Sequence, residues 1–337
     1  MRLWLFIALV ISVFQSYAQR SDFATVNFNK ADSIALEYKN DGLYNLPLLS
    51  HNLTSSLSTD VEKFRAIFKW VSSNISNDYG LFEINQRKRQ RYKNDSLKLE
   101  EWNARFRKQS FKKLLRKQRT ICSGYAYLVK KLSDLSQIEC QIIQGFAKTS
   151  TIDVSTLDMP NHAWNAVKLN GKWYLCDPTW ASGTPHPETN KFEFNYNDGF
   201  FLASPKLFAI NHFPVEQKWL LLENSNPTYQ DFLDAPIIYG KTYRNLNAYS
   251  QPKTLFNTVY KYQKVTFQCE LSKTINVKDV KLMLDDGSSS KTIHPENTTI
   301  NHQTLTIEYS FDRTGIYDVH LMIGTDLISS HTFEVKG

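Results

Sequence analysis

Several features are scarce in this sequence, and each scarcity excludes a class of protein. The 337 residues include only 12 glycines and 11 prolines, which excludes collagen-like and wholly disordered chains. Only one stretch, at the N-terminus, is apolar enough to enter a membrane, so a polytopic membrane protein is excluded. Four cysteines are too few for a disulfide-stapled scaffold, and none lies in a CxxC pair of the kind that binds metal. Aromatic residues, in contrast, make up 13% of the chain, which predicts at least one sizeable core.

The N-terminal stretch has the pattern of a secretory signal peptide. A positive charge at Arg2 precedes an apolar run, Leu3 to Phe14, that is too short to cross a bilayer, and Ser16-Tyr17-Ala18 offers the small residues of a cleavage site. No cysteine follows the run, which disfavours a lipoprotein, and an uncleaved anchor is the alternative. We therefore predict that residues 1–18 are a signal peptide and that the protein is exported, to the periplasm or the cell exterior, without a transmembrane segment after cleavage.

The net charge of +7 has a local origin. Between Arg87 and Arg119 the chain holds 14 lysines and arginines against three acidic residues, and Trp102, Phe106 and Leu114 recur there at helical spacing. This pattern predicts one or two amphipathic helices with a basic outer face. A solvated helix face is the first interpretation, and contact with an anionic surface is the second. Nucleic acid is not an expected partner, because an exported protein rarely meets it.

Local patterns predict helices, one hairpin and a strand-rich C-terminal part. Asp60 can cap a helix whose apolar residues recur up to Ile75, with Gly80 beyond its end, and a second helix begins at Cys122. Asn170-Gly171 between two alternating runs is the strongest hairpin signal in the chain, and strands are expected at residues 140–146, 162–169 and 172–177. Residues 178–239 are expected to be irregular. Short alternating runs between residues 259 and 335 predict a small antiparallel β-sandwich.

Three residues in this frame can carry nucleophilic chemistry. Cys122 would lie at a helix N-terminus, where unpaired N–H groups and the helix dipole stabilise a thiolate and can also hold an oxyanion. In a hairpin that turns at Asn170-Gly171, opposed residue numbers sum to about 341, so Asp177 is displaced by two residues from the position opposite His162. Asp177 could then orient the imidazole while the other ring nitrogen takes the thiol proton. Whether Cys122 meets this pair depends on tertiary structure.

Each of the three residues also has a purely structural interpretation. Cys122 could be one more buried thiol among the four cysteines, His162 a strand histidine, and Asp177 part of a turn before a proline. Taken singly, each structural interpretation is at least as strong as the functional one. The order of cysteine, histidine and aspartate, taken together, favours a site.

The sequence around these residues resembles the transglutaminase-like superfamily, in particular its bacterial and kyphoscoliosis-peptidase-like branch. The motifs that carry the resemblance are Cys122-Ser123-Gly124-Tyr125-Ala126, His162-Ala163-Trp164-Asn165 and Trp173 to Trp180, supported by Arg65 to Val71 and by Phe201 to Pro205 with His212-Phe213-Pro214. The resemblance implies a papain-like α+β core in which Cys122 is the nucleophile, His162 the base and Asp177 the residue that orients the base. It implies attack on carboxamides through a thioester. We expect no cofactor and no metal, and because no acidic calcium-binding run is present, calcium control is not carried over.

We therefore expect N-terminal helices and an antiparallel sheet in a transglutaminase-like domain at residues 19–240, with a basic helical insertion at 86–119, followed by an Ig-like β-sandwich at 255–337. The predicted function is that of an exported cysteine-dependent acyl-transfer enzyme with a protein or peptide substrate, most simply a peptidase-type hydrolase. Protein-glutamine cross-linking is the alternative among enzymes, and a non-catalytic binding scaffold that retained the fold is the alternative outside them. Tyr79 and Gln118 are candidates for the second oxyanion donor.

Overall fold

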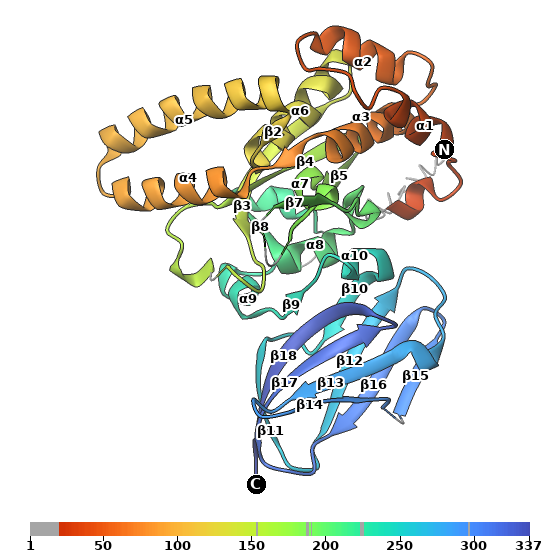
Figure 1. The fold of residues 1–337 in the computed structure, drawn as a ribbon. Helices are drawn as coiled ribbons and strands as arrows, with labels where there is room; N and C mark the ends of the chain where they lie inside the picture. The colour runs from red at the N-terminus through yellow and green to blue at the C-terminus, as the bar shows by residue number, and fades with distance from the viewer. Residues whose placement is uncertain (1–19, 153, 187–188, 190, 223–225, 296) are drawn as a thin grey trace, which may run out of the picture.

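The structure, a computed structural model, describes residues 20–152, 154–186, 189, 191–222, 226–295 and 297–337. The predicted signal peptide, residues 1–18, lies outside the described residues. Within those ranges, no helix has both the length and the hydropathy that a membrane span requires. Figure 1 shows a helix-rich part and, beneath it, a strand-rich part formed by the C-terminal segment of the chain. The predicted α+β fold with a C-terminal sandwich is confirmed.

A four-stranded antiparallel sheet with the order β5-β4-β3-β8 forms the centre of the helix-rich part. Helix α6 packs on β3 and β4, α3 packs on α6, and α1 and α2 pack against α3. The strands are β3 (Cys140–Ala147), β4 (His162–Leu169), β5 (Lys172–Cys176) and β8 (His212–Pro214), and the helices are α1 (Asn29–Glu37), α2 (Leu46–Thr54), α3 (Asp60–Asn74) and α6 (Cys122–Leu135).

Helix α3 forms where the apolar spacing predicts it, and only its N-cap differs from the prediction. Thr59 rather than Asp60 is the N-cap, because Thr59 and Glu62 exchange side-chain to backbone hydrogen bonds in a capping box. The helix ends at Asn74, where the chain becomes extended and enters a short strand. Gly80 lies beyond the end of α3, as predicted, and is already part of the following helix.

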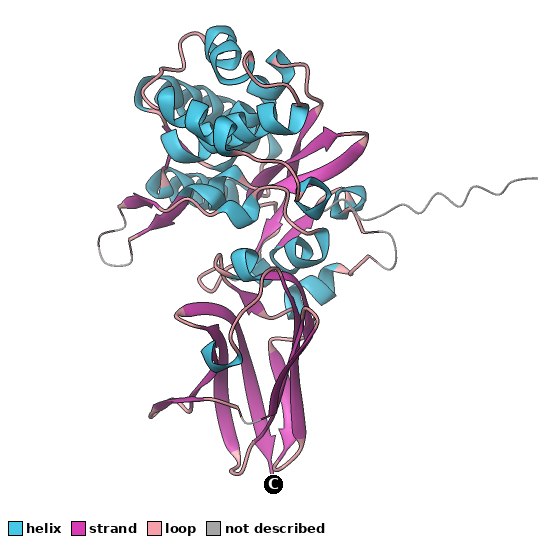
Figure 2. Ribbon diagram, turned by 90° about the vertical axis from the view of Figure 1, so that its right-hand side faces the viewer, coloured by secondary structure: helices cyan, strands magenta, loops and turns pink. Residues whose placement is uncertain are grey.

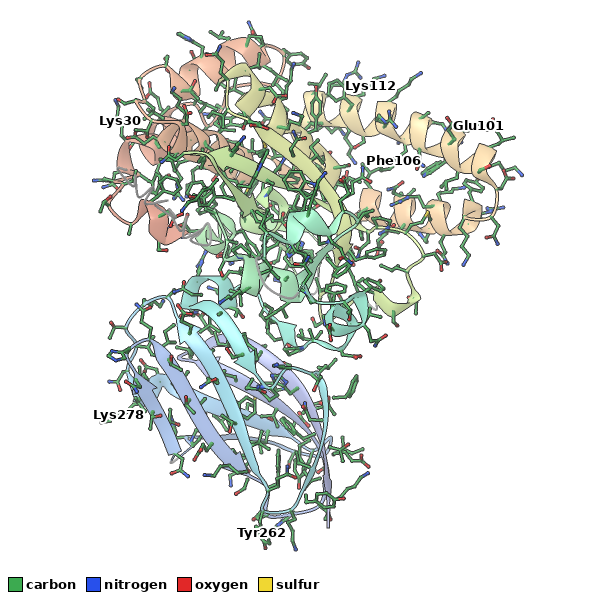
Figure 3. All side chains as sticks on the ribbon, turned by 180° about the vertical axis from the view of Figure 1, so that it is seen from behind. Lys30, Glu101, Phe106, Lys112, Tyr262 and Lys278 are labelled. Atoms are coloured by element: carbon green, nitrogen blue, oxygen red, sulfur yellow. The ribbon has the colours of Figure 1, made fainter. Side chains whose placement is uncertain are left out.

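Helices α4 (Tyr79–Tyr92) and α5 (Ser96–Lys117) form the basic hairpin, residues 79–117, which projects from the body of the molecule (Figure 1). The prediction of one or two amphipathic helices is confirmed, although α4 begins earlier than the basic residues do. Buried Leu81, Trp102 and Phe106 pack with Ile121 and hold the two helices together. In Figure 3 Phe106 lies on the inner side of α5, whereas Lys112 extends away from it.

The hairpin of β4 and β5 has the predicted register. Asn170 and Gly171 both have positive φ values, 49° and 81°, as a two-residue turn of this kind requires. Asn165 lies opposite Cys176, so that opposed residue numbers sum to the expected value. Strand β5 ends one residue earlier than predicted, because Asp177 becomes the N-cap of the short helix α7 (Pro178–Ser182).

The segment 178–239 contains short elements where an irregular chain is predicted. They are α7, β6 (Gly183–Pro185), β7 (Phe192–Phe194), α8 (Pro205–Asn211), β8, α9 (Tyr229–Asp234) and β9 (Ile237–Ile238), with single turns of 3-10 helix between them. Most are too short to leave a periodic pattern in the sequence. Strand β8 matters most, because it pairs with β3 and extends the central sheet by one strand.

The C-terminal part is a β-sandwich of two sheets, ordered β10-β12-β16-β15 and β11-β18-β17-β13-β14 (Figure 2). Alternate residues such as Phe267, Ile307, Leu321 and Phe333 are buried within it. Strand β9 pairs with β18 and so joins the two parts of the molecule. After the linking helix α10 (Thr242–Asn245), the strands are β10 (Leu246–Gln251), β11 (Phe256–Tyr260), β12 (Lys264–Leu271), β13 (Val280–Asp285), β14 (Ser290–Ile293), β15 (Asn297–Asn301), β16 (Thr304–Ser310), β17 (Gly315–Ile323) and β18 (Asp326–Lys336).

Candidate active site

Cys122 is the first residue of α6, the position that the sequence predicts. Gly124 is required in the first turn of this helix, because a Cβ atom there would lie 2.1 Å from the hydroxyl oxygen of Thr120. Tyr125 is fully buried, and its hydroxyl donates to the carbonyl of Ile75 at the end of α3. The residues that follow Cys122 therefore lock the start of α6 against its neighbours. The N–H groups of Gly124 and Tyr125 donate to the carbonyl of Ile121, whereas those of Cys122 and Ser123 have no partner within the helix.

His162 begins β4, and its Nε2 atom lies 2.7 Å from Oδ2 of Asp177. The other carboxylate oxygen, Oδ1, accepts from the backbone N–H groups of Thr179 at 2.8 Å and Trp180 at 3.1 Å. Asp177 thus orients the imidazole and caps α7 at the same time. Cys122 packs against Ala163, the next residue in β4, and is close enough to His162 to raise its pKa. Because Nε2 faces Asp177, Nδ1 is the nitrogen left for the sulfur. The structure brings all three predicted site residues together.

The electrostatics of this group favour an ion pair. Burial opposes the charged imidazole, but the Asp177 carboxylate, the hydrogen bond with it and the neighbouring Cys122 raise the pKa of His162 to about 10. Burial also opposes ionisation of Asp177, yet the facing His162 and His212 hold the pKa of that carboxyl well below its usual value. At neutral pH the pair is therefore imidazolium and carboxylate.

His212 is a fourth member of the site that the sequence reasoning did not assign a role. It begins β8, is buried, and its Nε2 atom lies 3.1 Å from the same Asp177 oxygen. Its ring stacks on Phe208 at a centroid distance of 3.7 Å. Burial and the charge of His162 lower the pKa of His212 to about 4, so it is neutral and donates to Asp177. The stretch His212-Phe213-Pro214 was quoted for the resemblance, but only the pairing of β8 with β3 brings its histidine to Asp177.

His162, Asp177 and His212 also offer three ligand atoms within 4.8 Å of one another, the kind of group that could hold a metal ion. The same atoms already satisfy one another, since both Nε2 atoms lie at hydrogen-bond distance from Asp177 Oδ2. Hydrogen bonding within a buried catalytic group accounts for their proximity.

The remaining candidates take structural roles. Trp164 is 1% exposed and packs in the core, whereas half-buried Trp180 stacks on the His162 ring at a centroid distance of 5.4 Å. The Gln118 amide, a candidate oxyanion donor, instead donates to the carbonyl of Asp41 at 2.7 Å, and the Tyr79 ring stacks on Phe82. All four cysteines are free and buried, in agreement with the expectation of buried thiols.

Comparison with known proteins places this site in a family. The family described as "Transglutaminase-like superfamily" matches residues 48–178, a range that includes Cys122, His162 and Asp177. The human kyphoscoliosis peptidase is 34% identical over 177 residues, which cover 52% of this chain and 24% of that protein. Hillarin of Drosophila melanogaster is 23% identical over 247 residues, covering 69% of this chain and 27% of that protein.

The chain thus spans about a quarter of the length of these curated relatives. Among solved structures, the filamin domain of Lin-41 covers 23% of this chain and 82% of that chain at 13% identity, with a TM-score of 0.20. By this match and these relatives, residues 48–178 of the protein form a domain of the transglutaminase-like superfamily, a family of papain-like cysteine enzymes.

Proposed function

We propose that this protein is a cysteine-dependent acyl-transfer enzyme that hydrolyses peptide or other carboxamide bonds through a thioester on Cys122. One observation carries the proposal: His162 is hydrogen-bonded to Asp177 through one ring nitrogen, and Cys122 lies close enough to this histidine to raise its pKa. A thiol, a base and a residue that orients the base are the three parts that nucleophilic acyl transfer requires.

In the proposed reaction the Cys122 thiolate attacks the carbonyl carbon, and a C–S bond forms. The negative charge that develops on the carbonyl oxygen faces the N–H groups at the start of α6. When the intermediate collapses, the C–N bond breaks and the amine leaves with a proton from His162. Water then attacks the thioester while His162 takes its proton, the carboxylic acid leaves, and the thiolate–imidazolium pair is restored.

Asp177 and His212 act on this reaction through His162. Asp177 keeps the ring in one tautomer and stabilises its positive charge throughout the cycle. His212, which is neutral, donates a second hydrogen bond to the same oxygen and restrains the carboxylate from turning away. Hydrolysis is favoured over cross-linking because water reaches any such site, whereas amine transfer needs a site that excludes water.

The test compares the wild-type protein with Cys122→Ala and, as a matched control, Cys269→Ala in the sandwich. Each protein is incubated with casein and a labelled primary amine, and both new amino termini and incorporated label are measured. We expect new termini from the wild type and the control, and none above background from Cys122→Ala. Incorporated label without new termini would instead indicate cross-linking. Neither product from any of the three proteins would favour the binding scaffold.

We also propose that residues 1–18 direct export. The support is the order of positive charge, short apolar run and small residues at that end of the chain. Expression in a bacterial host, followed by cell fractionation and N-terminal sequencing, tests this directly. We expect a mature protein that begins at Gln19 outside the cytoplasm, and an uncut cytoplasmic chain would contradict the proposal.

A further inference from the structure

The basic hairpin is attached to the body of the protein right beside the nucleophile. At its base, β1 (Ser76–Asn77) pairs in parallel with β2 (Arg119–Thr120), which leads directly into Ile121 and Cys122. Asp78, which is buried, caps α4 and forms ion pairs with Lys113 and Arg119. Ile121 packs with the hairpin residues. The position of α4 is therefore coupled to the start of α6.

Arg89 on α4 reaches the site from this hairpin. Its Nη1 atom donates to the carbonyl of Pro160 at 2.8 Å, two residues before His162 in the chain. Its charge also interacts with Cys122, while partial burial lowers the pKa of Arg89. Arg89 thus lies where α4, the start of β4 and the start of α6 come together.

The guanidinium of Arg89 has hydrogen-bond donors to spare. Within the ranges that the structure describes, no carboxylate forms an ion pair with it, and Pro160 is the acceptor of its side-chain hydrogen bond. A guanidinium has five N–H donors, and its planar fork matches a carboxylate. A half-buried cation without a neighbouring anion costs free energy. An anionic group of a ligand that binds beside Arg89 would remove this cost.

The rest of the hairpin has the same sign of charge. Exposed basic side chains run along both helices, and they include Arg87, Arg105, Lys108 and Lys112. Only a few of the hairpin's cations are neutralised, by ion pairs such as Lys93 with Asp158 and Lys98 with Asp95. A ligand that follows the hairpin toward Cys122 therefore meets positive charge along its whole path.

We propose that the substrate is an acidic polypeptide segment, and that Arg89 is a specificity-determining residue that binds a carboxylate of the substrate beside the bond that Cys122 attacks. This inference rests on the proposed function, because it names the substrate class of the same site. The hairpin supplies the electrostatic attraction, and Arg89 supplies the local contact. A membrane surface is the weaker alternative, since a half-buried guanidinium beside a buried thiol is reached by a flexible chain and not by a flat bilayer.

The first test uses two alkylating reagents that differ in charge. Iodoacetate carries a carboxylate and iodoacetamide does not, and both transfer their methylene carbon to a thiolate with loss of iodide. We expect Arg89→Gln to lower the ratio of the iodoacetate rate to the iodoacetamide rate at Cys122 by about tenfold, the effect of one charge-assisted contact. Arg91→Gln, an exposed arginine one half-turn away, should leave the ratio within about twofold.

The second test measures binding without turnover, in a Cys122→Ser background. Fluorescence anisotropy compares a labelled peptide containing glutamates around a central glutamine with the same peptide carrying serines. We expect tighter binding of the acidic peptide, reduced about tenfold by Arg89→Gln, partly retained by Arg89→Lys and changed little by Arg91→Gln. Circular dichroism establishes whether each variant is folded. If Arg89→Gln is unfolded, the binding of the acidic peptide to Arg89→Lys tests the role of Arg89 instead.

The outcomes separate this inference from the proposed function. If casein is cleaved but the two peptides bind equally, or if Arg89→Gln and Arg91→Gln weaken binding equally, the inference is overturned and the proposed function stands. If casein is untouched but the reagent ratio and the peptide preference depend on Arg89, the anion site stands without the peptidase. Binding to vesicles that contain phosphatidylserine, with no peptide preference, would overturn the inference in favour of a membrane contact. If Cys122 reacts with neither reagent, the peptide measurement decides.

Discussion

Replacement of His212 by phenylalanine tests how the buried group around Asp177 works. Phenylalanine keeps a flat ring against Phe208, where the imidazole now stacks at 3.7 Å, but it cannot donate to Asp177. A hydrogen bond to a charged group contributes about 1.5–3 kcal/mol to the free energy of unfolding. Asp177 keeps its contacts with His162, Thr179 and Trp180, so we expect a loss near the lower limit, about 1.5 kcal/mol.

The same substitution should lower activity through the orientation of His162. Asp177 loses one of the donors that fix its Oδ2 atom, and a less restrained carboxylate holds the imidazole less firmly. We expect kcat of casein cleavage to fall about tenfold with KM unchanged, because the substrate does not contact His212. Urea unfolding at pH 7 and initial-rate kinetics are the two measurements.

His331→Phe is the matched control, since His331 is also a buried histidine but lies in the sandwich. Its ring bonds Tyr249 at 2.7 Å and the carbonyl of Thr254 at 2.9 Å. The His331→Phe variant should lose a similar free energy of unfolding and retain the full activity of casein cleavage. A His212→Phe protein with wild-type kcat, or one whose activity loss is matched by the control, would refute the positioning role.

Two further predictions concern pH and packing. Because the folded pKa of His162 is raised to about 10 from its ordinary value of 6.5, its stabilising contribution should be complete below pH 6.5 and lost as the pH rises through about 10. The lowered pKa of Asp177 has the opposite sign, so its contribution should be present above pH 3.8 and lost in more acidic solution. Urea unfolding across this range should show both losses in the wild type and neither in Asp177→Asn, and a pH profile shared by the two proteins would contradict the ion pair. Gly124→Ala should destabilise the protein by about 1–3 kcal/mol through its clash with Thr120. Gly80→Ala, in open space within α4, should stabilise it by up to about 1 kcal/mol, and thermal melts that rank the two variants in the reverse order would contradict the packing at Gly124.

The errors of the sequence-based prediction have physical causes. Thr59 and Asp60 are both good N-cap residues, and only the reciprocal bonds with Glu62 select Thr59. The exact end of helix α3 within the predicted region is set by β1, which must reach β2, a partner more than forty residues away in the chain. Local spacing carries no information about such a partner.

In the candidate site, too, some contacts follow from neighbouring residues and others depend on tertiary packing. The turn at Asn170-Gly171 sets the register of β4 and β5 through its own dihedral angles, so the proximity of His162 and Asp177 follows from neighbouring residues. The position of Cys122 at a helix start likewise follows from local apolar periodicity. What these patterns leave open is whether the helix start faces the hairpin.

The amino-acid sequence by itself determined helices α3 and α6 and the basic hairpin, the register of β4 and β5, the strand-rich C-terminal part and the motifs that indicated the family. Each of these depends on residues close together in the chain, where backbone preference and apolar alternation act directly. Tertiary structure alone decided that the sulfur meets the imidazole, that His212 on β8 joins Asp177, and that Arg89 reaches the start of α6. These contacts join elements that are distant in sequence, and only the packing of helices on the central sheet sets the distances between them.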